Sequence, residues 1–159
     1  MPLITRHISL LFALCYISVG CSQTTDPTSY AKYIDDKDVT EIIQTLASEA
    51  FEGREAGTPA GRRTANYIAT HYEKMGLTPV VDSVSTKSYY QQFKFRGKQV
   101  TSNILGMVKG SEFPDEIIII SAHYDHLGKK SDTYFPGADD NASGIAALLE
   151  VAAAFSKAK

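Results

Sequence analysis

Apolar residues recur at helical spacing in three stretches of the chain. The first stretch is residues 38–50, in which valine, isoleucine, leucine and alanine form one apolar face. The second stretch begins at Thr58-Pro59, because a hydroxyl N-cap followed by proline at the first helical position is typical of a helix start, and it ends at Gly76. The third covers residues 142–156, which are rich in alanine and leucine, with Asn141 as the expected N-cap. The pattern predicts three helices.

Strand patterns lie between the second and third of these helices. Residues 89–95 are aromatic-rich and partly alternating, and Gly97 marks a turn into a second strand at 100–108 that is expected to break near Gly106. Ile117–Ile120 is a run of four isoleucines without alternation, which predicts a strand that is buried on both faces. Helices combined with strands in this order predict an α/β fold.

The N-terminal segment has the pattern of an export signal. Arg6 precedes an apolar run at residues 8–19, which is too short to span a bilayer. Small residues then lead to Cys21, as in a bacterial lipobox, where the cysteine receives a lipid. We therefore expect a signal peptide over residues 1–20, a tether anchored to the membrane through Cys21 over 21–29, and one domain over 30–159. An exported bacterial lipoprotein on the periplasmic or cell-surface face of a membrane is the expected location; the alternative is an ordinary secretory signal with an incidental cysteine.

Composition and charge narrow the class of protein. The chain has 159 residues, of which 43% are hydrophobic and 21% are charged, and these fractions are typical of a soluble globular domain. Its formal net charge is −2, and the basic residues are spread along the chain. Nucleic acid is therefore not expected as a partner.

Candidate chemistry lies on either side of a loop that follows the isoleucine run. His123 and Asp125 are two residues apart, so on extended backbone they project to the same side, and the carboxylate can orient the histidine. Asp139 and Asp140 are adjacent, so only one of them can face a metal ion. Histidine nitrogen and aspartate oxygen together suit zinc. Taken singly, each pair also fits a structural role, and His126 and His71 are assigned no function.

These residues stand in motifs that resemble those of a known family. SAHYDH at residues 121–126 and PGADDNASGIAALLEV at 136–151 are similar to the signature of the co-catalytic two-zinc aminopeptidases, peptidase family twenty-eight of the metallopeptidases. FEGREAGT at 51–58 resembles the N-terminal region of the same family. The resemblance implies the N-terminal part of a three-layer α/β/α fold with a mostly parallel central sheet, incomplete at the C-terminus.

The resemblance also implies roles for single residues. His123 corresponds to a terminal zinc ligand, Asp125 to the catalytic acid that orients it, and Asp140 to the carboxylate that bridges two zinc ions, with a cis peptide bond between Asp140 and Asn141. The expected reaction is the removal of N-terminal residues from peptides with a free N-terminus by water that zinc activates. The family's general-base glutamate and remaining ligands have no counterpart here, so the chain by itself is expected to be an inactive fragment.

Three alternatives stay open at this point. One is an acyltransferase like the glutaminyl cyclases, which share this fold and use a single zinc ion. Another is a non-catalytic binding ectodomain on the same scaffold, and the third is a purely structural lipoprotein. Metal content separates them, because the peptidase is expected to hold two zinc ions, the cyclase one and the others none.

Overall fold

The computed structural model describes residues 26–95, 97 and 99–158. The predicted signal peptide and the lipidation site at Cys21 therefore lie outside the described residues. Regular structure begins with a 3₁₀ helix, η1 (Pro27–Tyr33), whose first turn is capped by the side chain of Asp26. No helix in the described part of the chain is long and apolar enough to cross a membrane.

The three predicted helices are confirmed. They are α1 (Asp36–Leu46), α2 (Pro59–Lys74) and α3 (Ser143–Lys157), and short helical turns η2 (Glu49–Arg54) and η3 (Ala138–Ala142) precede α2 and α3. The predicted cap of α2 is also present, because the hydroxyl of Thr58 accepts a hydrogen bond of 3.2 Å from the amide of Gly61. The first helix ends at Leu46, four residues earlier than its apolar periodicity indicates.

The predicted hairpin is present as β4 (Tyr90–Phe95) and β5 (Gln99–Ile104), which pair antiparallel from Tyr90 opposite Ile104 to Phe95 opposite Gln99. The chain continues into β6 (Gly106–Met107), which pairs with β1 (Thr78–Pro79). Two further antiparallel pairs are β2 (Val81–Asp82) with β3 (Lys87–Ser88), and β7 (Lys129–Lys130) with β8 (Thr133–Tyr134).

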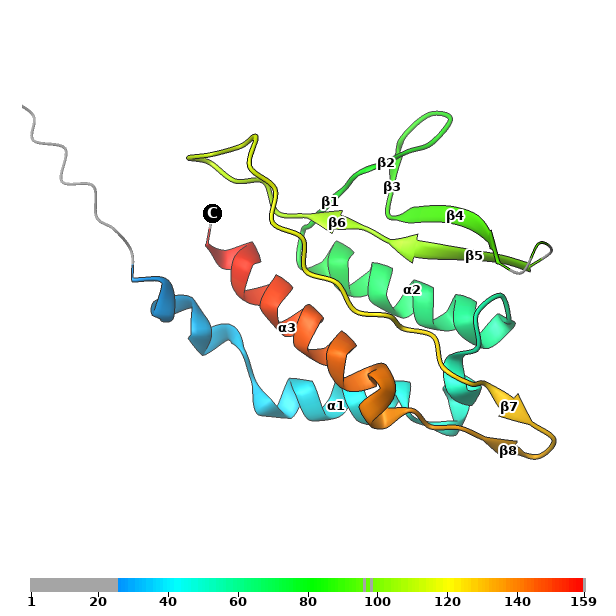
Figure 1. Ribbon diagram of the computed structural model, residues 1–159. Helices are drawn as coiled ribbons and strands as arrows, with labels where there is room; N and C mark the ends of the chain where they lie inside the picture. Colours follow the sequence, from blue (N-terminus) through cyan, green and yellow to red (C-terminus); the bar gives the residue numbers. More distant parts are fainter. Residues whose placement is uncertain (1–25, 96, 98, 159) are drawn as a thin grey trace, which may run out of the picture.

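The hydrophobic core lies where the three helices meet, and Figure 1 shows α3 lying across α1 and near α2. Its members are apolar side chains from all three helices, with Leu77 at the start of the strand region: Ile42, Leu46, Ile68, Tyr72, Leu77, Ala142, Ile145, Ala146 and Leu149. Leu46 is the last residue of α1, and Ala142 directly precedes α3. The core packing therefore holds the end of α1 and the start of α3 beside the loop that carries His123 and His126.

The predicted buried strand at Ile117–Ile120 is wrong for the described residues. Its four side chains are between 50% and 87% exposed, and the segment is an extended stretch without a strand partner. Figure 1 shows it in yellow, running between α3 and the strand region. A strand is defined by hydrogen bonds to a neighbour, and every strand pair in the described part of the chain is antiparallel and formed elsewhere. The structure is mixed α/β, without a parallel central sheet among these residues.

Candidate metal centre

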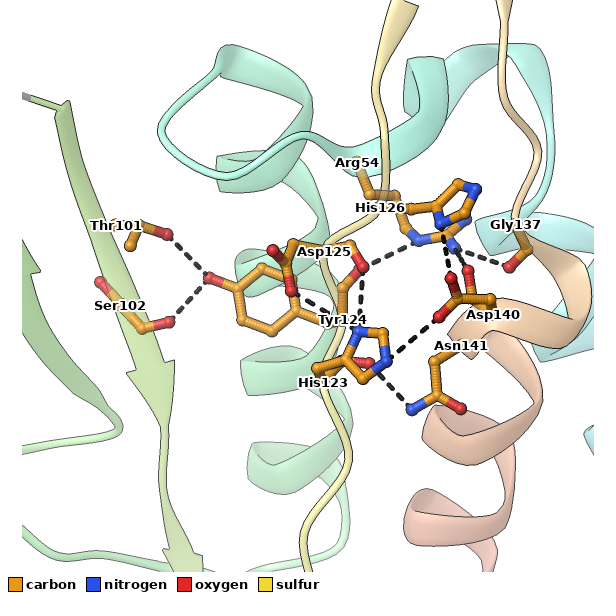
Figure 2. Close-up of polar contacts among 10 residues, drawn as sticks. All are labelled: Arg54, Thr101, Ser102, His123, Tyr124, Asp125, His126, Gly137, Asp140 and Asn141. Atoms are coloured by element: carbon orange, nitrogen blue, oxygen red, sulfur yellow. Dashed lines mark hydrogen bonds and ion pairs between the residues drawn. The ribbon is translucent and has the colours of Figure 1, made fainter. Parts of the chain in front are cut away.

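Two loop segments bring the predicted residues together. We call residues 121–128 the histidine arm and residues 136–141 the acidic arm. Figure 2 shows the arms meeting where the Nε2 atom of His123 lies 3.2 Å from the Oδ1 atom of Asp140. The side-chain amide of Asn141 also donates to the backbone carbonyl of His123 at 3.3 Å. The two halves that the sequence placed on either side of a loop are therefore in direct contact.

Tyr124 anchors the histidine arm to the β4–β5 hairpin. Its hydroxyl donates to the carbonyl oxygen of Ser102 at 2.7 Å and lies 3.4 Å from the hydroxyl of Thr101 (Figure 2). Because side chains alternate along extended backbone, this anchor directs His123 and Asp125 away from β5. The hairpin thus sets the direction in which the side chains of His123 and Asp125 project.

The acidic arm is a tight turn that leads into α3. Gly137 has a φ of +57°, and a β-carbon at that position would lie 2.5 Å from both the carbonyl oxygen of Asp140 and the ring of His126. The Asp140–Asn141 peptide bond is cis, as the resemblance implies. The prediction that Asn141 caps α3 is wrong, because Ala142 is the N-cap residue and the side chain of Asn141 turns to the histidine arm instead.

Asp125 orients His123 through its backbone rather than through its carboxylate. The Nδ1 atom of His123 lies 3.1 Å from the carbonyl oxygen of Asp125, whereas the Oδ1 atom of that residue is 3.6 Å away. A carbonyl oxygen can only accept, so this contact places the proton on Nδ1 and leaves Nε2 free as a ligand atom. Two acceptor atoms, Nε2 and the Asp140 oxygen, then face each other at 3.2 Å, an arrangement that a cation between them stabilises.

His126, which was assigned no function from its sequence position, also contacts Asp140. Its Nδ1 atom lies 3.3 Å from the Oδ2 atom of Asp140, and its side chain is 12% exposed. The side chains of His123 and Asp140 are by contrast 55% and 66% exposed, so solvent and ions reach the centre from their side. Alternation along an extended segment would place His126 opposite His123, and only the bend of the histidine arm brings both to one carboxylate.

The donor set fits zinc in chemistry and in spacing. With metal–ligand bonds of about 2.0–2.1 Å, two ligand atoms of a tetrahedral zinc ion lie roughly 3.3 Å apart. The distances from Asp140 to the two imidazoles, 3.2 and 3.3 Å, match this value. Among the described residues, no group of three histidine, cysteine, aspartate or glutamate side chains is arranged to hold a metal ion. The arms therefore supply a partial ligand set.

Arg54 lies behind the centre and is also absent from the predicted site. Its side chain is fully buried, and its guanidinium donates to backbone carbonyls of both arms (Figure 2). Burial lowers the pKa of Arg54 from its ordinary value, while the charges of Asp140 and Asp125 act in the opposite direction. Arg54 lies in the segment FEGREAGT at residues 51–58, which resembles the N-terminal region of the family but indicates no role for the arginine.

Comparison with known proteins gives consistent matches. Residues 103–159 match peptidase family M28. The chain is 30% identical over 158 residues to the alkaline phosphatase isozyme conversion protein of Escherichia coli, an alignment that covers 92% of this chain and 43% of that protein. It is 35% identical over 82 residues to a probable zinc metalloprotease of Pyrenophora teres, an alignment that covers 47% of this chain and 17% of that protein. It is 37% identical over 59 residues to a probable zinc metalloprotease of Pyricularia oryzae, covering 34% of this chain and 11% of that protein. The chain spans less than half the length of each of these relatives.

Proposed function

This chain belongs to peptidase family M28, and from that premise we propose that it forms the N-terminal part of a zinc-dependent aminopeptidase. The observation that carries the proposal is the contact of His123 with Asp140, because it joins the two motifs of the family in one centre with the spacing of zinc ligands. The substrates would be peptides with a free N-terminus. The names of the fungal relatives, probable zinc metalloproteases, support a metallopeptidase.

Each residue of the centre has a definite task in this proposal. His123 offers Nε2 as a ligand, and the carbonyl of Asp125 holds the imidazole in the tautomer that makes Nε2 available. Asp140 offers one carboxylate oxygen toward His123, at 3.2 Å from its Nε2 atom. When bound, zinc supplies a Lewis acid that polarises a carbonyl oxygen and lowers the pKa of water.

We further propose that the centre holds two zinc ions with Asp140 between them. The two oxygens of this carboxylate face different imidazoles, Oδ1 toward His123 and Oδ2 toward His126, so they are directed to two separate positions. The remaining ligands and the general base would come from a part of the protein beyond the residues described. The same part would supply strands on both sides of Ile117–Ile120 and so complete a mostly parallel sheet in a three-layer fold.

The experiment uses the protein that carries this chain, purified and loaded with zinc. We expect it to hydrolyse leucine p-nitroanilide and to lose this activity on treatment with a chelator, because the reaction depends on the metal. Asp140→Asn should lower both zinc affinity and activity by about 10-fold or more, since an amide is a poor zinc ligand. Asp139→Asn is the matched control. Asp140 contacts His123 and His126, whereas no such contact is formed by Asp139.

Two results would count against the proposal. Equal loss of zinc in the Asp139→Asn and Asp140→Asn variants would show that Asp140 is not a ligand. Cleavage of an N-acetylated substrate at the same rate as the substrate with a free amine would show that a free N-terminus is not required. That result would be consistent with a metallopeptidase but would exclude an aminopeptidase.

A further inference from the structure

The guanidinium of Arg54 makes an unusual set of contacts. Its Nε atom donates to the carbonyl of Tyr124 at 3.0 Å, and its two terminal nitrogens donate to Leu46, Pro136 and Gly137, with a longer contact of 3.5 Å to the carbonyl of Asp140. A guanidinium has five N–H donors, and backbone carbonyls take all of them. Among the described residues, Arg54 forms no ion pair with a carboxylate.

Stability alone does not explain such a residue. Burying a charge is costly without a counterion in contact, and apolar side chains of similar volume often replace buried charges without loss. Arg54 also has a φ of +55°, a left-handed conformation that is unfavourable for a non-glycine residue. Costly conformations of this kind gather at functional sites, where the surrounding structure holds them.

The contacts of Arg54 reach both arms next to their ligands. Tyr124 directly follows His123, and the carbonyl of Asp140 belongs to the other ligand itself. The backbone of the same turn pairs with the histidine arm, because the carbonyl of Arg54 accepts from His126 at 3.3 Å and that of Gly53 accepts from Gly128 at 2.9 Å. One residue thus fixes the distance between the two arms.

We propose that Arg54 is a positioning residue that sets the separation of His123 and Asp140 and thereby the zinc affinity of the centre. This inference rests on the proposed function. The planar fork is essential, because its donors point in fixed directions to three separate chain segments: the end of α1, the histidine arm and the acidic arm. A lysine keeps the charge but carries its three donors on one nitrogen and cannot reach them together.

The test compares Arg54→Lys with Arg63→Lys in the protein that carries this chain, since the proposal takes the remaining zinc ligands from beyond the described residues. Arg63 is the matched control, because it contacts Ala50 and Glu52 near the same turn but its side chain is 45% exposed and touches neither arm. Both variants keep the charge. We expect Arg54→Lys to weaken zinc binding by about 10-fold or more, the range found for residues that orient metal ligands, and to shift the visible absorption bands of the cobalt-substituted centre. Arg63→Lys should stay within about twofold of the wild type by the same measure.

A purely structural role for Arg54 gives a different result. Ile68→Ala removes a buried side chain of α2 that belongs to neither arm, and it is expected to lower the free energy of unfolding without changing the cobalt spectrum. If Arg54→Lys behaves like Ile68→Ala, with lower stability but unchanged zinc affinity and unchanged spectrum, the positioning role is wrong.

A measurement on the wild type covers the case in which Arg54→Lys does not fold. The guanidinium ¹⁵N signals of Arg54 should shift on zinc titration while those of Arg63 do not, because only Arg54 contacts the arms. Signals of Arg54 that stay unchanged while zinc binds would overturn the inference. A wild type that binds no zinc at all would instead contradict the proposed function.

Discussion

At the scale of single residues, most side chains of the centre act on backbone atoms. Asn141 donates to the carbonyl of His123, His123 contacts the carbonyl of Asp125, Tyr124 donates to Ser102, and Arg54 donates to carbonyls of both arms. Such contacts fix the course of the chain and leave the carboxylate oxygens of Asp140 to face the histidines. Substitution of Tyr124, Asn141 or Arg54 is therefore expected to alter the backbone conformation of the arms, while the side chains of His123 and Asp140 remain present.

His71 gives a prediction for the pH dependence of stability. It lies partly buried on α2 with its ring 4.5 Å from that of Tyr67, and burial first, then the charge of Lys74, lowers its pKa below the ordinary value of 6.5. The unfolded chain therefore takes up the proton first as the pH falls, so stability decreases from about pH 6.5 down through the lowered pKa of the folded state. We expect His71→Gln to reduce the loss of unfolding free energy between pH 7.5 and 5.5.

The measurement is urea unfolding of the wild type and of His71→Gln at both pH values. The comparison uses the difference between the two pH values within each protein, because the substitution also removes the ring contact with Tyr67. An equal pH dependence in the two proteins would show that His71 is protonated to the same extent in the folded and unfolded states.

At the scale of elements, the isoleucine segment is the main point where sequence and structure differ. Four consecutive β-branched residues fit the pattern of a strand that is buried on both faces. The pattern does not specify which segments pair with the strand or cover its faces. The described strands pair in other places, so Ile117–Ile120 is left exposed. The segment is an aggregation hazard unless another strand covers it.

We expect strand partners for this segment in the protein that carries the chain. The amides of residues 117–120 should then exchange with deuterium at least about 1000-fold more slowly than in an unstructured chain, because amides in core strands open only with large free-energy cost. The amides of Ser111 and Glu112, in an exposed turn, are the internal control. Exchange of residues 117–120 as fast as that of the control would refute the proposed central strand.

Sequence patterns predicted the helices well, because periodicity and caps such as Thr58-Pro59 are local signals that act within one element. The resemblance of two motifs to the family predicted that His123 and Asp140 share one site, and the structure places their side chains 3.2 Å apart. His126 and Arg54 were missed, because their place depends on how three distant segments fold together. Asn141 illustrates the same limit: a good cap residue by type, it bonds across to the histidine arm in the folded chain.

At the scale of the whole molecule, the candidate centre lies at the surface of the helical core. A helical core supports two arms, and the arms carry part of a ligand set on a face where His123 and Asp140 remain more than half exposed. The chain spans 43% of the length of its Escherichia coli relative.

The most direct test is anomalous diffraction at the zinc absorption edge from crystals of the zinc-loaded protein. We predict a peak about 2.0–2.2 Å from the Nε2 atom of His123 and from an oxygen of Asp140. A second peak on the other oxygen of Asp140 would establish the two-zinc centre. Zinc bound only at sites away from both arms, with His123 and Asp140 free of metal, would contradict the proposal that these two residues are zinc ligands.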